Sequence, residues 1–166
     1  MTHYLDLIDR TTTGNRCDVT PLFADPEAFA QMLDDLLGRI GDLEFDLVVA
    51  VDALGFILGT GMAMRMGKGL VVARKGGKLP LACNPVTFVD YTGQTKGLEM
   101  RKDALRRGER VLIVDEWVET GAQICAVISL VEGLGGVVAG VASLNIDEGA
   151  ELVLQGYSCF HLHAGA

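Results

Sequence analysis

The segment from Arg110 to Gln123, RVLIVDEWVETGAQ, constrains the fold of this chain more than any other. Its apolar run RVLIV predicts a buried strand, and Asp115 and Glu116 follow directly at the end of that strand. The sequence then turns at Gly121 into an apolar stretch that predicts a helix. Because open parallel sheets bind ligands at the carboxyl ends of their strands, the segment predicts a ligand site.

The acidic pair and the turn after it suit the two ends of a ribose 5-phosphate. Adjacent carboxylates can accept hydrogen bonds from the 2′- and 3′-hydroxyls, and backbone N–H groups at a helix N-terminus attract a phosphate. Thr120 can cap the helix or offer its hydroxyl to a phosphate oxygen. Taken alone, the same residues are explained equally well by an ordinary strand-to-helix turn with an acidic surface and a threonine cap.

The rest of the chain predicts alternating strands and helices. Residues 25–40 have apolar positions at three- and four-residue steps, with Asp25 as a helix cap and Gly41 as a stop. Further helices are expected at 55–66 and about 121–134, and strands at 45–51, 70–73, 111–114 and 137–144. This order predicts an α/β fold with a central, mainly parallel sheet flanked by helices. The length suits a single domain over residues 1–166.

Residues 76–97 fit neither the helical nor the strand period. They contain two prolines, several glycines and a polar run at 91–95. A loop of this length is uncommon in a compact domain unless it is functional or disordered. The segment therefore predicts a mobile flap or an extended hairpin.

The charge composition narrows the class of ligand. A net charge of −8 disfavours nucleic acids and anionic membranes as partners, although the cluster of Arg74, Lys75 and Lys78 could bind a small anion. The four cysteines show no zinc spacing, the N-terminus lacks a signal sequence, and no uncharged apolar run reaches membrane-spanning length. These features predict a cytoplasmic protein with reduced thiols.

Six segments carry a resemblance to a known family. They are CDVTPLFADPEAF (17–29), VVAVDALGFILG (48–59), VVARKGGKLP (71–80), FVDYTG (88–93), LEMRKDALRRGERVLIVDE (98–116) and ETGAQ (119–123). In order and spacing they resemble the adenine branch of the type I phosphoribosyltransferases over most of the chain. The resemblance implies that family's fold, with a small hood and a mobile flap at about 76–97, and a homodimer.

The resemblance also implies an enzyme of purine salvage, a glycosyltransferase. It would move ribose 5-phosphate from phosphoribosyl pyrophosphate (PRPP) to a purine base, most readily adenine, and release pyrophosphate. Mg²⁺ would bridge the pyrophosphate and the ribose hydroxyls, so Asp115 and Glu116 would hold the ribose directly or through the metal or water. The loop of Glu119, Thr120, Gly121, Ala122 and Gln123 would bind the 5-phosphate.

Basic residues would face the pyrophosphate by the same resemblance. Ala53 and Leu54 lie in the segment that would contact it, Lys75 and Lys78 would neutralise it, and Arg74 would reach across a dimer interface. Placed cations stabilise a leaving group that gains negative charge. A solvated basic turn is the alternative explanation for the two lysines.

The flap and the N-terminal region would recognise the base. Asp90 and Tyr91 fall where the family has an acid followed by tyrosine, so Asp90 would act as a general base once the flap excludes water. A polar flap residue is the equal alternative for Asp90. Phe23 would line the base pocket, or else belong to the core.

Several site positions depart from the family pattern. Leu54 stands where an arginine would contact pyrophosphate, and Cys17 where an arginine commonly lies near the base. The family reads Ala-Thr-Gly-Gly-Thr in the phosphate loop, so Glu119 adds a carboxylate, Ala122 a Cβ, and Gln123 a longer side chain. The flap is also longer by about two residues. The alternatives are therefore a non-catalytic or regulatory relative that binds a purine or nucleotide, and a site for a sugar without a 5-phosphate.

Three weaker signals have two explanations each. Trp117 could stack on a base or ribose, or pack beneath the loop. His161 and His163 would share one face of a strand, where they could bind metal or complete an edge strand. The methionines of the 55–66 helix, at 62, 64 and 66, could form a dimer face or fill the core.

Overall fold

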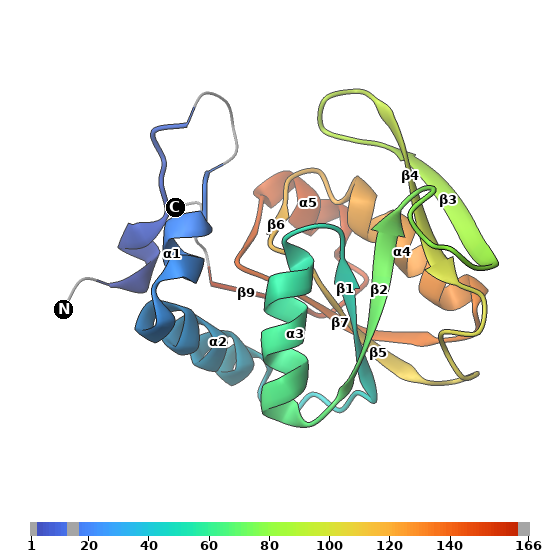
Figure 1. Ribbon diagram of the computed structural model, residues 1–166, viewed down its shortest axis with the longest axis horizontal. Coiled ribbons are helices and arrows are strands. Elements are labelled where there is room, and N and C mark those ends of the chain that lie inside the picture. Colours follow the sequence, from blue (N-terminus) through green and yellow to red (C-terminus); the bar gives the residue numbers. More distant parts are fainter. Residues whose placement is uncertain (1–2, 13–16, 163–166) are drawn as a thin grey trace.

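The computed structural model describes residues 3–12 and 17–162 and shows an α/β fold around one large sheet (Figure 1). Its strands are β1 (Leu47–Val51), β2 (Gly69–Lys75), β3 (Cys83–Val89), β4 (Thr95–Arg101), β5 (Arg110–Val114), β7 (Val137–Ser143) and β9 (Cys159–His161). Within the described residues, the sheet order is β3-β4-β2-β1-β5-β7-β9. Neighbouring strands are parallel along the part of the sheet that runs β2-β1-β5-β7-β9. β4 is antiparallel to both of its neighbours, β3 and β2. The predicted mainly parallel sheet is confirmed.

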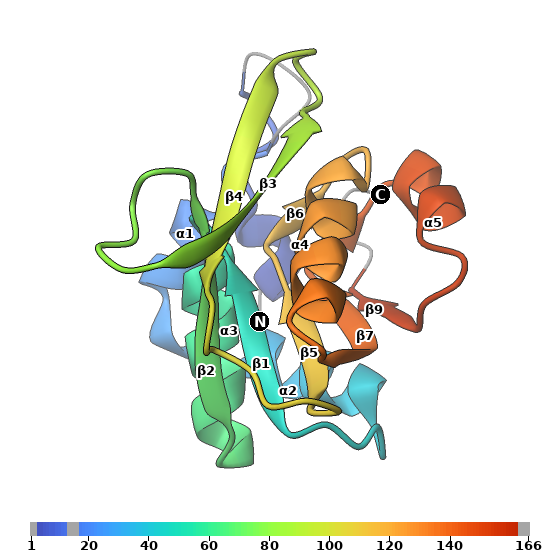
Figure 2. The same cartoon turned by 90° about the vertical axis from the view of Figure 1, so that its right-hand side faces the viewer.

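Helices cover both faces of this sheet, and two short parallel strands form a separate small sheet. The helices are η1 (Tyr4–Leu7), α1 (Thr20–Ala24), α2 (Pro26–Ile40), α3 (Gly55–Met66), α4 (Ala122–Gly133) and α5 (Glu148–Val153). The short pair is β6 (Trp117–Val118) with β8 (Asn145–Ile146). α2 and α3 lie on one side of the sheet and α4 lies on the other (Figure 2).

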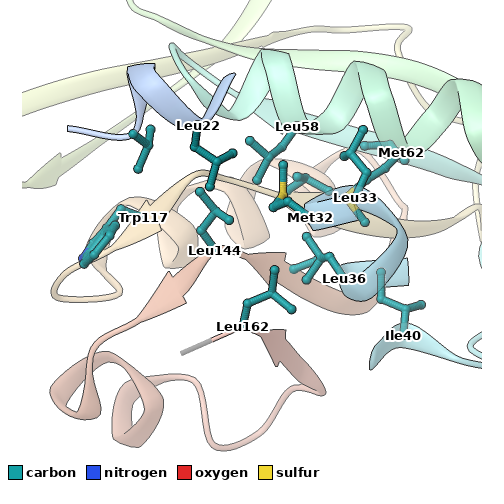
Figure 3. Close-up of a cluster of buried hydrophobic side chains, with 14 of the residues drawn as sticks. Leu22, Met32, Leu33, Leu36, Ile40, Leu58, Met62, Trp117, Leu144 and Leu162 are labelled. Carbon is teal, nitrogen blue, oxygen red and sulfur yellow. The ribbon is translucent and has the colours of Figure 1, made fainter. Parts of the chain in front are cut away.

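Alternation along the central strands divides the core into two layers. In β1, Val48 packs with α2 and α3, whereas Val49 faces the opposite layer beside Ile124 of α4. The first layer contains Met32, Leu36 and other fully buried side chains (Figure 3). The continuous apolar runs in the sequence are thus explained by strands that are buried on both faces.

The cap and stop residues that the sequence predicts are confirmed for helices α2 and α3. The Asp25 carboxylate accepts hydrogen bonds from the backbone N–H groups of Glu27 and Ala28, at 3.0 and 2.9 Å. Gly41 ends α2 with φ of 56°, and Gly67 ends α3 in the left-handed region. α3 has the bounds that the sequence predicts.

The 76–97 segment contains the hairpin that was one of its two predicted forms. β3 and β4 pair from Cys83 opposite Arg101 to Val89 opposite Thr95. The sequence missed that β4 continues past the segment into the central sheet, where Leu98 pairs with Lys75. Burial of Leu98 and Met100 explains why this strand stays attached to the core. The mobility of the hairpin stays a prediction.

The weaker sequence signals have separate outcomes. Met62 is buried, Met66 packs against the core, and Met64 is 79% exposed, so the α3 methionines do not share one environment. His161 ends β9 and its Nε2 lies 2.8 Å from Glu151 Oε1, while His163 lies outside the described residues. In the described part of the chain, no three His, Cys, Asp or Glu side chains are grouped as metal ligands. No helix found there is long and apolar enough to cross a membrane.

Candidate active site

A cleft of about 310 Å³ opens at the carboxyl ends of β1 and β5, beneath the β3–β4 hairpin. It brings together three segments that the sequence had placed in one site: the turn after β1, the loop after β5 and the flap. The predicted site residues that line it are Ala53, Leu54, Lys75, Asp90, Tyr91, Asp115, Glu116, Glu119, Thr120, Gly121 and Gln123. Phe23, Arg74, Lys78 and Ala122 do not line it.

The acidic pair lies at the floor of the cleft and is almost inaccessible to solvent. Asp115 and Glu116 are 6% and 2% exposed. The backbone N–H of Glu116 donates to Asp115 Oδ1 at 2.8 Å, and the Gln123 side-chain amide donates to Asp115 Oδ2 at 2.9 Å. Burial raises the pKa of Asp115 to about 8, and repulsion from Glu116 and Glu119 acts in the same direction. Each Asp115 oxygen keeps a lone pair for a further donor such as a ribose hydroxyl.

The loop after the acidic pair forms the predicted helix N-terminus. Gly121 has φ of 77°, and α4 begins at Ala122, whose N–H donates to Thr120 Oγ1 at 3.3 Å. A side chain on Gly121 would contact Val153 of α5 at 3.2 Å and would also be strained by the positive φ. The side-chain amide of Gln123, a residue of the predicted phosphate loop, extends to Asp115.

A buried polar network supports this loop from behind. The Trp117 indole N–H donates to Asp147 Oδ1 at 3.2 Å, and the Asn145 side-chain amide donates to the same oxygen at 2.8 Å. The Ser143 hydroxyl lies within hydrogen-bonding distance of the backbone oxygens of Glu116 and Asn145, at 2.8 and 2.9 Å. Trp117 is 5% exposed, packs in the hydrophobic core and also borders the cleft. It therefore packs beneath the loop, which was one of its two predicted roles.

The turn between β1 and α3 forms the second wall. The peptide bond between Asp52 and Ala53 is cis, and Asp52 Oδ2 accepts from the backbone N–H of Lys75 at 3.4 Å. α3 then begins at Gly55, which lies directly against Asp115. A Cβ at that position would come within 2.8 Å of Val114 O and 3.0 Å of Asp115 Cα, so only glycine allows this approach.

The basic cluster is divided between the cleft and its outer edge. Lys75 lines the cleft, whereas the Arg74 guanidinium turns to Asp52, with Nε 3.6 Å from Oδ2. Lys78 lies in the turn after β2, which Glu99 of β4 holds by accepting backbone hydrogen bonds from Lys78 and Leu79 at 2.8 and 2.6 Å. The hydrogen bond from Leu79, followed by that from the Cys83 thiol to Glu99 Oε2 at 3.2 Å, lowers the pKa of Glu99 to about 2.

At the hairpin tip, Asp90 holds a turn. Its Oδ1 accepts from the Thr92 N–H, the Thr92 hydroxyl and the Gln94 N–H, at 2.9, 2.6 and 3.0 Å. The hydrogen bond from the Thr92 hydroxyl is the main cause that lowers the pKa of Asp90, with Lys96 acting in the same direction. Tyr91 is 50% exposed beside it.

Several lining residues were absent from the predicted set. Phe88 and Lys96 contribute from the two hairpin strands, Asp52 from the β1 turn, and Cys17 from the N-terminal region. Phe88 lies on β3 two residues before Asp90, which directly follows the strand, so the alternation of a strand could have placed Phe88 in the site. Phe23 instead packs edge-on against Phe29, with ring centroids 5.5 Å apart.

Comparison with known proteins gives the family. Residues 23–159 match the model of the phosphoribosyl transferase domain. The chain belongs to the phosphoribosyltransferase family. The resemblance found in the sequence is thereby confirmed, and the chain is a phosphoribosyltransferase-like enzyme in both sequence and fold.

Relatives of this phosphoribosyltransferase share much of its sequence. The adenine phosphoribosyltransferase of Thermotoga maritima is 44% identical over 129 residues, which are 76% of this chain and 73% of that protein. The enzyme of the same name from Leuconostoc citreum is 40% identical over 142 residues, or 83% and 80% of the two chains.

Solved structures of similar proteins have the same arrangement of elements. The crystal structure of adenine phosphoribosyltransferase from Rhodothermus marinus has a TM-score of 0.84 at 31% identity and covers 96% of this chain and 97% of that one. The enzyme from Thermoanaerobacter pseudethanolicus has a TM-score of 0.83 at 37% identity, over 89% and 87% of the chains. The Saccharomyces cerevisiae enzyme, at 25% identity and a TM-score of 0.82 over 96% and 98%, was solved with adenine and an imino-altritol bisphosphate.

Proposed function

We propose that this phosphoribosyltransferase acts on adenine and PRPP to give AMP and pyrophosphate. In this reaction the bond from ribose C1′ to the pyrophosphate oxygen breaks, and its electrons leave with the pyrophosphate. A bond forms between a purine nitrogen and C1′, and that nitrogen loses its proton. Relatives that are 40–44% identical and carry the name adenine phosphoribosyltransferase support the choice of base.

The observation that carries the proposal is the placing of the acidic pair and the loop amides on one cleft wall. Asp115 and Glu116 would accept the ribose 2′- and 3′-hydroxyls, and the N–H groups of residues 120–123 would bind the 5-phosphate. The same loop includes Glu119 and Ala122, which the sequence resemblance places beside the phosphate. The Gln123 side chain donates to Asp115, so in this proposal it would lie on the ribose side of the site.

The pyrophosphate would lie between the β1 turn and the basic segment. Ala53 and Leu54 face the cleft from one side, and Lys75 faces it from the other. Lys78 and Arg74 are one short turn away, so they could reach the pyrophosphate from the rim or from a neighbouring subunit. Cations near the departing oxygen would stabilise the charge that develops there.

The purine would lie beneath the flap. Asp90 and Tyr91 border the cleft from the hairpin tip, and Phe88 offers an aromatic ring beside them. The lowered pKa keeps Asp90 ionised near neutral pH, so its Oδ2, which lies 3.8 Å from the Lys96 ammonium, can also accept a hydrogen bond from a purine N–H. It becomes a stronger proton acceptor only if flap closure removes water from around it. Phe23 would act from beneath the pocket, through the core.

Mg²⁺ fits this donor set when PRPP is present. Mg²⁺ prefers oxygen ligands and is commonly held by one or two carboxylates together with substrate phosphates and water. Asp115 and Glu116 are adjacent carboxylates at the cleft floor and would hold the ion directly or through water. The ion would supply positive charge to the pyrophosphate.

The catalytic proposal is tested by turnover with a panel of bases. Purified protein would be incubated with PRPP, Mg²⁺ and adenine, hypoxanthine or guanine, and pyrophosphate release would be measured. We expect release with adenine above all. Binding of AMP by calorimetry without release from any base would instead establish the non-catalytic alternative, and binding of unphosphorylated nucleosides alone would favour the sugar-binding one.

Pairing of two copies would complete the proposed enzyme. The family resemblance implies a homodimer in which Arg74 would serve the neighbouring subunit. In this chain the Arg74 Nε lies 3.6 Å from Asp52 Oδ2, outside the cleft lining. Light scattering of the purified protein would give the mass. A monomer with full turnover would remove the proposed role of Arg74.

A further inference from the structure

The cleft contains more acids than cations, although its proposed substrate is strongly anionic. Among the described lining residues, the cations are Lys75 and Lys96, and the acids are Asp52, Asp90, Asp115, Glu116 and Glu119. Leu54 stands where the family resemblance implies an arginine for pyrophosphate. Inside the cleft, Lys96 is the second cation available to this substrate, and the sequence assigned it no role.

The register of the hairpin directs Lys96 into the cleft. Lys96 of β4 pairs with Phe88 of β3. Asp90 lies one residue beyond the end of β3, two residues after Phe88, and its N–H donates to Gln94 O at 2.9 Å, so the ladder continues to it. Paired residues and residues two apart on a strand share a face of the sheet. All three side chains accordingly line the cleft.

Lys96 also lies close to Lys75, the cation already proposed to face pyrophosphate. Lys75 pairs with Leu98, which follows Lys96 by two residues on β4. The two lysines are thus diagonal neighbours on the same face of the antiparallel pair, at a spacing of about 7–8 Å. One anion with two phosphate groups can contact both ammonium groups.

The present partners of Lys96 leave its ammonium group available for a ligand. Its Nζ donates to Gln94 Oε1 at 2.6 Å and lies 3.8 Å from Asp90 Oδ2. The hairpin turn does not depend on this ion pair, because Asp90 Oδ1 already accepts hydrogen bonds from Thr92 and from the Gln94 N–H. The Lys96 side chain is 45% exposed, so it can reorient at little cost.

We propose that Lys96 binds the pyrophosphate group of PRPP together with Lys75 and supplies the positive charge that Leu54 lacks. This inference rests on the proposed function. It places a cation on the flap itself, so that the hairpin contacts both the base, through Asp90 and Tyr91, and the leaving group, through Lys96.

The test compares Lys96→Ala and Lys96→Arg with the wild type in both directions of the reaction. Loss of one charge-assisted contact at a partly exposed position lowers affinity by about tenfold. We expect Lys96→Ala to raise KM for PRPP and for pyrophosphate by that factor, with KM for adenine and AMP unchanged. Lys96→Arg should restore most of the loss. Lys102→Ala, an exposed lysine beyond the end of β4, serves as the matched control and should change nothing.

Direct binding of magnesium pyrophosphate, measured by calorimetry, separates this inference from the proposed function. If no base supports turnover but Lys96→Ala still binds pyrophosphate about tenfold more weakly than the wild type, the subsite stands and the assigned reaction fails. Equal binding by the two proteins, no binding by either, or an equal rise in all four KM values overturns the subsite. The last result would mean that Lys96 only stabilises the hairpin.

Discussion

Asp115 is the residue at which function and stability are most clearly opposed. Its carboxylate lies at the cleft floor, and burial raises its pKa to about 8. Because this pKa is higher in the folded than in the unfolded chain, the folded state binds the extra proton between about pH 4 and pH 8. The stability of the fold should therefore decrease as the pH rises through this range.

Replacing Asp115 by Asn should reveal this cost. The neutral amide removes the buried charge, and the Gln123 amide can rotate to accept from it. One pKa unit corresponds to about 1.4 kcal/mol, so we expect a gain in unfolding free energy of at least about that size near pH 8. Urea unfolding at pH 5 and pH 8 would measure it, and turnover should fall by about a hundredfold or more.

Asp42→Asn provides the control, because Asp42 is exposed and far along the chain from the site. It should leave both stability and turnover unchanged. If Asp115→Asn is instead less stable than the wild type at pH 8, the Asp115 carboxylate is better solvated than its burial implies.

Gln123 provides a second test at the scale of single residues. It is the side chain whose position the sequence resemblance did not predict, because only the folded loop shows that it reaches Asp115. Gln123→Ala removes the amide that donates to Asp115 Oδ2. Because Asp115 is proposed to bind the ribose, we expect PRPP binding to weaken by about tenfold. Gln123→Thr should regain part of the loss through a hydroxyl at the phosphate. Initial rates over a range of PRPP concentrations would distinguish the two variants, and identical KM values for all three proteins would contradict the assigned contact.

At the scale of elements, Glu99 joins β4 to the basic turn after β2. Its lowered pKa, about 2, means that its contribution to stability is present above about pH 4.5 and is lost as the pH falls toward 2. Glu99→Ala should free the backbone N–H groups of Lys78 and Leu79 and loosen this turn. We expect faster trypsin cleavage after Lys78, followed by mass spectrometry.

Glu109→Ala is the matched control for this experiment, since Glu109 also accepts one backbone hydrogen bond, from Arg106 at 2.8 Å, in a different turn. It should leave cleavage after Lys78 at the wild-type rate. Equal protection of Lys78 in both variants would show that other contacts hold the turn.

The approach of α3 to β5 depends on Gly55. A methyl group there would come within 3.0 Å of the backbone of β5 and Asp115, so Gly55→Ala should lower both stability and PRPP turnover. Gly38→Ala is the control, because nothing lies within 4 Å of its added Cβ in α2. That change should stabilise the protein by about 0.5–1 kcal/mol. The thermal unfolding midpoints of both variants would test this. A lower midpoint for Gly55→Ala with a higher one for Gly38→Ala would show that crowding at Gly55 outweighs the gain in helix propensity.

The elements differed in how far the sequence could predict them. The caps at Asp25 and Gly41 and the apolar stripes are local signals, so α2 and α3 were found with nearly correct ends. The continuation of β4 past residue 97 was missed because the strand signal there, with Leu98 and Met100 buried between polar residues, depends on pairing with β2 and β3. Pairing partners that are distant in sequence have no local signal.

For the molecule as a whole, the order of strands and helices was sufficient to predict the sheet and the edge at which the site lies. The family resemblance then predicted most lining residues, such as Asp115 and Lys75. The inward direction of Lys96 could not be predicted, because it follows from the hairpin register. The sequence thus predicts which segments meet, and the fold determines which of their side chains face inward.

Substrate binding should be visible in the stability of the whole protein. A ligand that binds only the folded state at a hundred times its Kd stabilises it by about 2.7 kcal/mol. We expect PRPP with Mg²⁺ to raise the thermal midpoint, and the increase to be lost on adding EDTA. AMP, whose single phosphate needs no pyrophosphate subsite, should still raise the midpoint with EDTA present. An undiminished PRPP effect in EDTA would argue against a role for the metal in binding.

The contact between Gln123 and Asp115 also links two positions in the evolution of this chain. A glutamine at the start of α4 is tolerable here because its side-chain amide has a partner in Asp115. The effect of a mutation at either position therefore depends on the residue at the other. A lineage that replaced Asp115 would lose the reason to keep Gln123, so substitutions at the two sites should arise together rather than independently.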